Sequence, residues 1–319
     1  MYYIGVDLGG TNIAIGIVDE NKKIVAKGSV PTGASRDGEL IVKDMAALAE
    51  KLLKENKIAL DEVAYVGIAS PGFIDDKNGV VLCAFNLNFF NFPIASLFKR
   101  YLPIEKVYVA NDANAAALGE VVAGAARGSK NAVMITLGTG VGGGIIIDGK
   151  IYSGSNCAGG ELGHMVIHHG GRQCSCGRRG CWEAYSSATA LSAITKEKIT
   201  ECEIKGIPTL MIDDYKASGK VTARTAFSAM KKGDKVAASV VDYYIDCLAC
   251  GIANIVNIFQ PDILCIGGGI CNERENLLTP LTAVVDREQY TRDSDCKTKI
   301  VIAELGNDAG IIGAASLGL

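Results

Sequence analysis

One pattern occurs twice in this chain and restricts its fold more than any other feature. It is an apolar strand, a glycine-rich turn, a return strand and a hairpin into a third strand. The first copy covers residues 1–30 and turns at Gly9-Gly10-Thr11; the second covers residues 131–153 and turns at Gly138-Thr139-Gly140. In the second copy Asp148-Gly149 is a typical two-residue hairpin sequence. Two copies of one motif predict two related α/β domains with a cleft between them.

The rest of the chain alternates predicted helices and strands in the same α/β manner. At 319 residues, 49% of them apolar, the chain can build one large or two medium domains. We expect a first domain over residues 1–115, completed by the C-terminal helix at about 305–319, and a larger second domain over residues 116–304. Further expected elements are helices over 40–56 and 309–317 and strands over 63–69, 107–110, 263–266 and 299–303.

The two glycine turns are candidate anion sites. Glycine lets successive backbone N–H groups converge closely on a phosphate, and Asp7 stands at the strand end before the first turn. One such turn most often only closes a hairpin, but two turns with threonine hydroxyls can clamp a polyphosphate. Gly267 and Gly268 offer a third close-approach surface, suited to a ribose or base. Gly138-x-Gly140-x-x-Gly143 matches the glycine pattern of a dinucleotide-binding site, but such a site needs a helix after the turn. Here a strand follows, which excludes a dinucleotide-binding site.

A dense set of soft ligands lies between residues 161 and 183. His164, Cys174, Cys176 and Cys181 form a Cys₃His set of the kind that binds tetrahedral zinc. Four protein ligands leave no position for water, so the predicted zinc is structural, and a zinc hydrolase is disfavoured. His168 and His169 are rival ligands that spacing alone does not exclude. Free cysteines in a reducing compartment are the simpler alternative, which this spacing does not favour.

Asp112 is the best candidate for an acid or base. It follows the strand over 107–110 and stands beside Asn111, which places its carboxylate at a strand end. Phosphoryl transfer needs positioning, charge neutralisation and a base near the attacking hydroxyl. A helix N-cap at Asn111 or Asp112 is the structural alternative, and taken alone it would be the better interpretation. The surrounding phosphate motifs favour catalysis.

Composition argues against several other classes of protein. The net charge of −3, with charges interspersed, predicts no nucleic-acid or membrane-surface partner. Eleven cysteines, eight of them scattered, suit the reducing cytoplasm better than a disulfide framework. No signal peptide is evident, and the apolar stretch over 245–259 is too short for a membrane span, so we expect a buried helix there. Cys247 and Cys250 fall in this helical pattern and are expected in the core.

Taken together, these motifs resemble the ROK family of sugar kinases, within the actin-like ATPase superfamily. The likeness runs over nearly the whole chain, and the cysteine loop is its most specific part. Where many glucokinases of the family have a tryptophan, Phe89 and Phe90 stand here. The segments that carry the resemblance are IGVDLGGTN, VANDANAAALGE, LGTGVGGGIIIDGKIYSG, AGGELGH, CSCGRRGCWEAY, DILCIGGGI and AGIIGAA.

The resemblance implies two actin-like (ribonuclease H-like) domains with a central cleft and assigns roles to individual residues. Asp112 would be the catalytic base. Sugar hydroxyls would be bound by Gly72, Asn86, Asn111, Asp112, Glu161, His164 and Glu183. ATP phosphates, Mg²⁺ and the adenosine would be held by Asp7, Gly9, Gly10, Thr11, Gly138, Thr139, Gly140, Gly267 and Gly268. His164 would also bind zinc with Cys174, Cys176 and Cys181.

The expected activity is transfer of phosphate from ATP to the 6-hydroxyl of a hexose, with glucose as the acceptor. N-acylmannosamine, N-acetylglucosamine and fructose stay open as acceptors, because epimers differ by single hydroxyls that motifs do not encode. A non-catalytic sugar sensor is the alternative from another class. The chain opens on the first phosphate strand with no helix-turn-helix, which favours an enzyme over a repressor. A homo-oligomer, dimer or tetramer, is expected from the resemblance.

Overall fold

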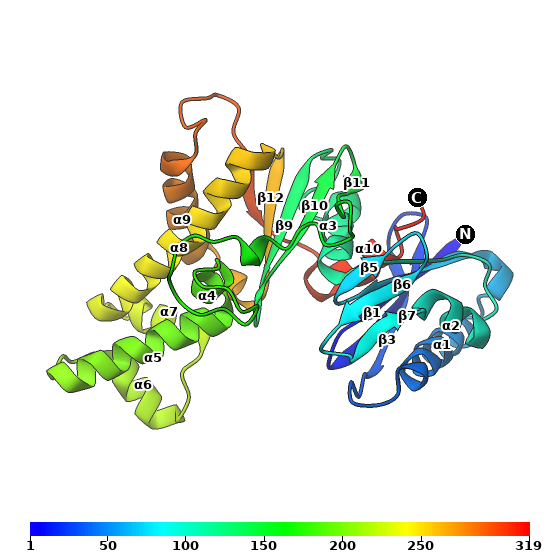
Figure 1. The fold of residues 1–319 in the computed structure, drawn as a ribbon, viewed down its shortest axis with the longest axis horizontal. Helices are drawn as coiled ribbons and strands as arrows, with labels where there is room; N and C mark the ends of the chain where they lie inside the picture. Colours follow the sequence, from blue (N-terminus) through cyan, green and yellow to red (C-terminus); the bar gives the residue numbers. More distant parts are fainter. The chain divides into compact units, whose positions relative to one another are not determined.

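The computed structural model describes residues 1–319, and contacts divide the chain into two compact units (Figure 1). The first unit comprises Met1–Met134, Gly144–Gly160 and Ala303–Leu319, and the second comprises Ile135–Gly143 and Glu161–Ile302. The first unit thus runs past the predicted boundary at residue 115 and includes the C-terminal residues. The limits 1–115 and 116–304 stay a prediction, because a compact unit need not coincide with a domain of the fold.

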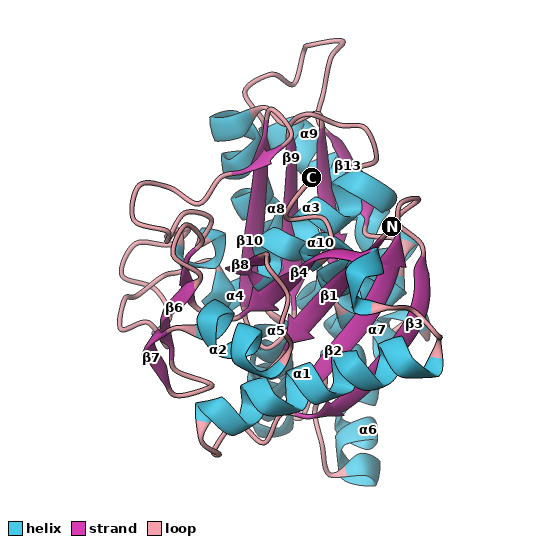
Figure 2. Cartoon of the chain, turned by 90° about the vertical axis from the view of Figure 1, so that its right-hand side faces the viewer, coloured by secondary structure: helices cyan, strands magenta, loops and turns pink.

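The first unit is built on a mixed five-stranded sheet in the order β3-β2-β1-β4-β8. β1 to β3 form an antiparallel meander, whereas β4 and β8 run parallel to β1. Helix α1 lies across the meander, packing on β2 and β3 with a face of apolar residues (Figure 2). The bounds are β1 Tyr2–Leu8, β2 Asn12–Asp19, β3 Ile24–Pro31, α1 Gly38–Glu55, β4 Val63–Ser70, β8 Val107–Asn111 and α3 Asp112–Ala123.

A row of three glycines crosses this sheet and makes room for the last helix, α10 (Ala309–Ala314). Gly16, Gly5 and Gly67 are register partners on β2, β1 and β4. A Cβ atom on Gly5 would lie 2.0 Å from the carbonyl oxygen of Ile311, and one on Gly67 would lie 1.8 Å from that of Ala314. Only glycine permits this approach, so α10 rests directly on the backbone of the sheet. The helix stops at Ala314, short of the predicted Leu317, because i→i+3 hydrogen bonds tighten its last turn.

A small antiparallel sheet in the first unit was not predicted. It has the order β5-β6-β7 and is followed by α2. Its strands are three to five residues long, too short for a clear alternation of apolar and polar residues. The bounds are β5 Phe73–Asp75, β6 Val80–Ala84, β7 Phe89–Phe92 and α2 Ile94–Tyr101.

A second five-stranded sheet has the order β11-β10-β9-β12-β13. As predicted, the second copy of the motif forms β9, β10 and β11, although β11 has only two residues. The strands are β9 Ala132–Leu137, β10 Val141–Ile147, β11 Lys150–Ile151, β12 Ile263–Gly267 and β13 Lys299–Ile302. The helices of the second unit are α4 Glu183–Ser186, α5 Ala188–Lys205, α6 Leu210–Ser218, α7 Ala223–Lys231, α8 Lys235–Phe259 and α9 Glu275–Glu288. Short 3₁₀ helices are η1 Leu60–Glu62, η2 Leu162–His164, η3 Gly269–Glu273 and η4 Gly306–Asp308.

Helix α8 is the one helix long and apolar enough, by length and composition, to cross a membrane. That is weak evidence for a span, because 56% of its most apolar window is buried within the fold. Core helices of globular proteins meet the same criteria. The predicted buried helix over 245–259 is therefore confirmed as the second part of α8, but the argument that it is too short for a span was wrong, because the helix begins at Lys235 and has 25 residues. The prediction that Cys250 lies in the core is wrong. This residue is exposed, on the side of α8 opposite its buried apolar residues.

The glycine row yields a stability prediction. Gly67→Ala should destabilise the protein by about 3 kcal/mol or more, because the new methyl group meets a backbone carbonyl that cannot move aside. Urea unfolding measures this change. Gly269→Ala is the control, since a Cβ atom there meets nothing within 4 Å, and it should change the unfolding free energy by less than about 1 kcal/mol. Equal stabilities of the two variants would contradict the proposed backbone contact.

Candidate functional site

Two carboxylates stand at strand ends in the first unit. Asp7 is on β1 near its carboxyl end, and Asp112 is the first residue of α3, directly after β8. Strands β1, β4 and β8 are parallel, so their carboxyl ends meet at one edge of the sheet, where open α/β folds bind ligands. Burial, reinforced by the nearby charge of Asp112, raises the pKa of Asp7 to about 6, against a smaller opposing effect of Lys27. Burial also raises the pKa of Asp112, opposed by backbone hydrogen bonds.

The first glycine turn is a closed loop of backbone hydrogen bonds. The N–H of Gly9 donates to the carbonyl of Asn12 at 2.9 Å, and the Thr32 hydroxyl donates to the carbonyl of Gly9 at 2.6 Å. Thr11 is exposed, and its carbonyl accepts the N–H of Thr32. The backbone of Gly310 passes so close to Asp7 that a Cβ atom there would lie 2.7 Å from the carboxylate. The turn and Asp7 are thus held in a fixed geometry, as an anion or cation site requires.

Asn111, not Asp112, is the N-cap of α3. Its Oδ1 accepts the N–H groups of Ala113 at 2.9 Å and Asn114 at 3.2 Å, and its Nδ2 donates to the carbonyl of Gly72 at 3.1 Å. A hydrogen bond from the Asn111 side chain also opposes the rise in the pKa of Asp112. The capping alternative therefore belongs to Asn111. Asp112 uses Oδ1 to accept the N–H of Ala113 at 2.8 Å and is not needed as a cap.

Gly72 and Asn86 lie at the small sheet. Gly72 has φ +95°, and a Cβ atom on it would lie 2.0 Å from the carbonyl oxygen of Cys83, so no other residue fits. Asn86 is exposed, and its side chain approaches the backbone of Gly10. A Cβ atom on Gly10 would lie 3.4 Å from Nδ2 of Asn86. The structure thus brings Asn86 to the first glycine turn, although the two are far apart in the sequence.

Two phenylalanines beside Asn86 are exposed: Phe90, which the sequence analysis named without assigning it to the site, and Phe85, which it did not name. Phe85 is 82% exposed and Phe90 56% exposed, and their rings meet edge to face at 5.9 Å. Phe89, by contrast, is buried and stacks on Phe92. Of the pair that replaces the family tryptophan, only Phe90 is therefore available to a ligand. The signal that could have found Phe90 is the alternation of β7, which is only four residues long.

In the second unit the other glycine turn meets the late glycine run. The N–H of Gly138 donates to the carbonyl of Gly140 at 3.0 Å, and the exposed Thr139 forms the tip. Gly268 has φ +104°, and a Cβ atom on it would lie 2.2 Å from the carbonyl oxygen of Leu137, the residue before the turn. Gly267 ends β12 immediately before it. The predicted phosphate and adenosine segments of this unit are therefore neighbours.

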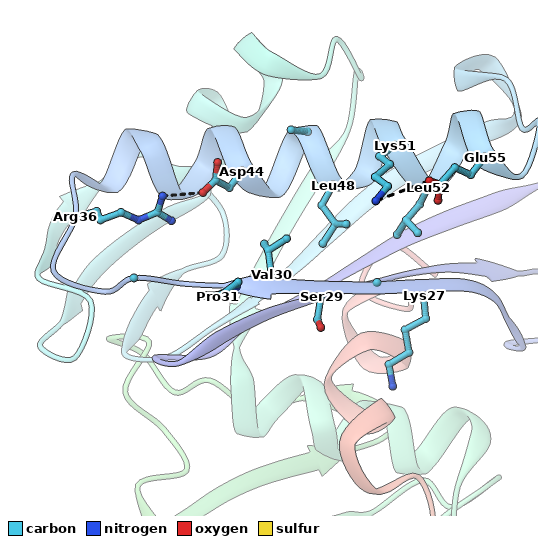
Figure 3. A pocket seen from close by; sticks show the side chains of 13 residues that line it. Lys27, Ser29, Val30, Pro31, Arg36, Asp44, Leu48, Lys51, Leu52 and Glu55 are labelled. Carbon is cyan, nitrogen blue, oxygen red and sulfur yellow. Dashed lines mark ion pairs between the residues drawn. The ribbon is translucent and has the colours of Figure 1, made fainter.

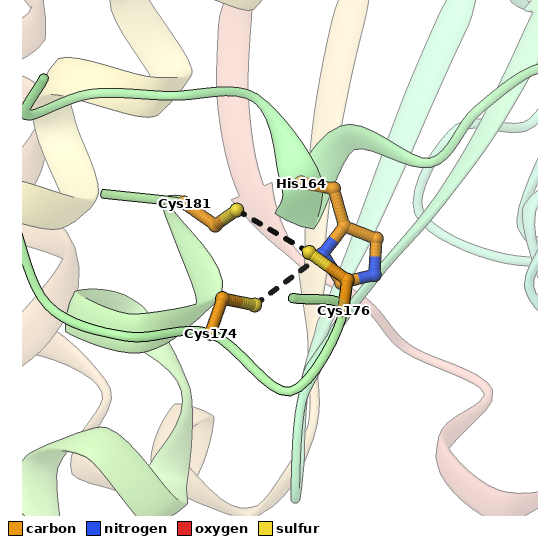
Figure 4. Close-up of side chains that lie close together, drawn as sticks. All are labelled: His164, Cys174, Cys176 and Cys181. Carbon is orange, nitrogen blue, oxygen red and sulfur yellow. Dashed lines mark hydrogen bonds between the residues drawn. The ribbon is translucent and has the colours of Figure 1, made fainter. Parts of the chain in front are cut away.

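The four predicted metal ligands come together, and all their donor atoms lie within 4.8 Å of one another (Figure 4). Cys174 Sγ lies 3.6 Å from His164 Nδ1, and Cys176 Sγ lies 3.6 Å from Cys181 Sγ. A tetrahedral zinc ion would separate two sulfurs by about 3.8 Å and a sulfur from a nitrogen by about 3.5 Å. The cluster is therefore compatible with structural zinc. The rival ligands His168 and His169 are exposed and outside it.

The local fold holds these ligands and the adjacent carboxylates. Glu161 precedes the 3₁₀ helix η2 and His164 is its last residue. Gly163 of this helix packs so closely on β10 that a Cβ atom on it would lie 2.2 Å from the carbonyl oxygen of Val141. His164 turns Nδ1 toward the sulfurs, which leaves Nε2 for another partner. Glu183 begins α4 and accepts the N–H of Val141 through Oε2 at 3.0 Å. The cysteine loop is thus joined to the second glycine turn.

A separate groove of about 650 Å³ lies between β3 and α1 in the first unit (Figure 3). Its walls carry the ion pairs Arg36–Asp44 and Lys51–Glu55, and Leu48 and Leu52 lie between them. None of the predicted site residues lines it.

The predicted site residues themselves are divided between the two units: Asp7 to Asp112 in the first, Gly138 to Gly268 in the second.

Comparison with known proteins identifies the family. The family model described as "ROK family" matches residues 3–319. The chain belongs to the ROK family. It is 40% identical to the glucokinase of Thermotoga maritima over 98% of this chain and 96% of that protein. It is 38% identical to the glucokinase of Halalkalibacterium halodurans over 99% of this chain and 94% of that protein.

Solved ROK structures agree with the architecture described above. A ROK family glucokinase from Streptomyces griseus, in complex with glucose and AMPPNP, superposes with a TM-score of 0.80 at 33% identity, covering 99% of both chains. ROK sugar kinases have the two-domain actin-like ATPase fold, so the predicted fold class is confirmed. The roles of the individual site residues in this ROK protein stay predictions.

The raised pKa of Asp7 predicts that its ionised carboxylate lowers the free energy of unfolding. The folded state holds a proton on Asp7 up to about pH 6, whereas the unfolded chain loses it near pH 4, so wild-type stability falls as the pH rises through this window. Asp7→Asn should therefore be more stable than wild type at pH 7.5, by up to about 3 kcal/mol, with the gain vanishing near pH 4. Denaturant unfolding without ligands at both pH values measures this.

Asp61→Asn is the matched control, because Asp61 is an exposed carboxylate in the same unit. It should shift the unfolding free energy by less than about 0.5 kcal/mol at either pH. A destabilised Asp7→Asn variant at pH 7.5 would show that the carboxylate is held by favourable contacts and would refute the burial argument.

Proposed function

We propose that this ROK protein is an ATP-dependent hexose kinase that phosphorylates the 6-hydroxyl of glucose. The observation that carries the proposal is Asp112, a carboxylate at the first turn of α3 whose pKa burial raises. The glucokinases similar over the full chain, and the glucose and AMPPNP complex of the Streptomyces griseus relative, support the same activity.

Asp112 accepts the proton of the acceptor hydroxyl as that oxygen attacks the γ-phosphorus. Burial raises the pKa of Asp112, and a carboxylate with a raised pKa is a stronger base than an exposed aspartate. The Asn111 cap holds the start of α3, and therefore Asp112, in place. In phosphoryl transfer most of the rate enhancement comes from positioning and charge stabilisation, so this rigidity matters as much as basicity.

The hexose is assigned, by the family resemblance, to Gly72, Asn86, Asn111, Asp112, Glu161, His164 and Glu183. Carboxylates and amides pair with sugar hydroxyls as acceptors and donors, and a site built this way discriminates strongly against an acceptor lacking one hydroxyl. The exposed Phe85 and Phe90 beside Asn86 offer an apolar surface for the sugar ring.

The nucleotide is assigned to the glycine turns. Gly9, Gly10 and Thr11, with Gly138, Thr139 and Gly140, bind the phosphates, and Gly267 and Gly268 face the adenosine. Asp7 fits as the residue that holds Mg²⁺, because its pKa is raised by burial and by the charge of Asp112, and a cation relieves both effects. The magnesium ion, when bound, neutralises charge on the β- and γ-phosphates.

A structural zinc ion is assigned to His164, Cys174, Cys176 and Cys181. The donor set and its spacing fit zinc, and the four ligands leave no position for a reacting water. We also propose a cytoplasmic location, because the odd number and scatter of the eleven cysteines in the sequence suit a reducing compartment. We also propose a homo-oligomer, by the family resemblance.

Asp112→Asn should lower kcat for glucose by roughly 10²- to 10⁴-fold, because the amide cannot accept the proton. Glucose affinity, measured by calorimetry, should change far less. Asp61→Asn changes an exposed carboxylate just before the amino end of β4, away from the carboxyl ends of the strands, and should leave kcat unchanged. A coupled ADP assay over glucose, fructose, N-acetylglucosamine and N-acylmannosamine identifies the acceptor. Turnover of Asp112→Asn above a few per cent of wild type removes Asp112 from this role; sugar binding without ADP release indicates a sensor.

Elemental analysis tests the zinc assignment. Wild-type protein should carry about one zinc per chain, and Cys176→Ser should lose zinc and thermal stability because a ligand is missing. Cys296→Ser is the matched control, an exposed cysteine outside the cluster, and it should keep full zinc content. Wild-type protein free of zinc after purification without chelators would refute the assignment.

A further inference from the structure

Glu183 occupies the junction between the cysteine loop and the second glycine turn. Its backbone is held by the preceding residue, Trp182, which is fully buried, donates Nε1–H to the carbonyl of Cys247 at 3.1 Å and lies flat against Gly251 of α8. The N–H of Trp182 also donates to the carbonyl of Met165 at 2.8 Å. The carboxylate is therefore presented from a rigid base.

The two carboxylate oxygens of Glu183 contact different segments. Oε2 accepts the N–H of Val141, at the end of the glycine turn, at 3.0 Å. Oε1 accepts the hydroxyl of Ser175 at 3.2 Å, and the sulfur of Cys174 lies 3.8 Å from the same oxygen. One side chain thus bridges the turn to the loop that carries the cysteines.

Gly140 makes this bridge possible. A Cβ atom on Gly140 would lie 2.2 Å from Oε2 of Glu183, so any other residue would push the carboxylate away from the N–H of Val141. Gly140 of the predicted phosphate turn is thus needed for the contact with Glu183, and not only to let an anion approach the backbone. The carbonyl of Gly138 is tied to the N–H of Ala188 at 2.9 Å, which leaves Thr139 as the least restrained part of the turn.

Ser175 stands between two ligands of the metal cluster, Cys174 and Cys176. A cysteine that binds a metal does so as a thiolate and has no proton to donate, so in the loaded protein Cys174 cannot hydrogen-bond Glu183. The Ser175 hydroxyl is then the donor left for Oε1 from this loop. Its position is set by the two neighbouring ligands, because fixing both sulfurs fixes the backbone between them.

We propose that Ser175 is a positioning residue that holds Glu183 against the turn between β9 and β10, so that the metal-bound loop sets the geometry with which this turn binds nucleotide phosphates. The path is Ser175 Oγ to Glu183 Oε1, and Glu183 Oε2 to the N–H of Val141. Since Glu183 is also assigned to the sugar, the same carboxylate connects the sugar and nucleotide sites. This inference rests on the proposed kinase function.

Ser175→Ala tests the proposal in the full-length, zinc-loaded protein. Calorimetry with the nonhydrolysable nucleotide AMPPNP, in the presence of Mg²⁺, should give a Kd about threefold or more above that of wild type, because one hydrogen bond is lost. KM for ATP and KM for glucose should rise together. Ser175→Thr keeps a hydroxyl and should restore wild-type affinity. Ser239→Ala is the matched control, because this exposed hydroxyl bonds only to its own helix, at the carbonyl of Val236.

Zinc content and melting temperature separate positioning from folding. In Ser175→Ala both should equal those of wild type and Ser239→Ala, while nucleotide affinity falls. If wild type phosphorylates hexose and Ser175→Ala keeps wild-type AMPPNP affinity and KM values, the inference is overturned and the proposed function stands. If affinity falls only together with zinc content or stability, Ser175 merely supports the loop and the inference is also overturned. If wild type phosphorylates no hexose, the proposed function fails, whatever Ser175 does.

Discussion

Close approach of other groups to the backbone of glycine residues is the constraint on which this structure depends. In the first unit α10 rests on the sheet because Gly5 and Gly67 carry no side chain where its carbonyls arrive. In the second unit Gly251 lets Trp182 lie against α8, and Gly140 lets Glu183 reach the turn before β10. Each of these contacts places a functional segment at a distance that a single methyl group would destroy.

The buried carboxylates of Asp7 and Asp112, unlike these close contacts, lower the stability of the folded protein. Asp7 is buried near Asp112, and both carboxylates have raised pKa values because water is excluded from them. A protein selected for stability alone would neutralise such a site. The proposed function explains why the charges stay: one carboxylate serves a cation and the other a proton, and the ligands supply the compensation that the free protein lacks.

The cysteine loop is a scaffold whose influence extends beyond the sulfurs. It contains few apolar residues and little regular structure, so an ion held by four ligands is a physically sufficient reason for its order. Ser175 and Glu183 connect that loop to the glycine turn by two hydrogen bonds. The metal assigned to the loop would therefore affect the substrate sites through geometry, without taking part in the chemistry.

Much of this protein was determined by local sequence alone. Alternating apolar residues and turn glycines predicted both copies of the repeated motif, and ligand spacing predicted which side chains form the cysteine cluster, because such signals act over a few residues. The choice of Asn111 as the cap, the exposure of Phe90, the short strands β5 to β7 and the position of Asn86 at Gly10 were decided only by tertiary structure. These features depend on segments far apart in the chain, and no local pattern of residues encodes which distant backbone a glycine must accommodate or which oxygen of Glu183 finds Val141.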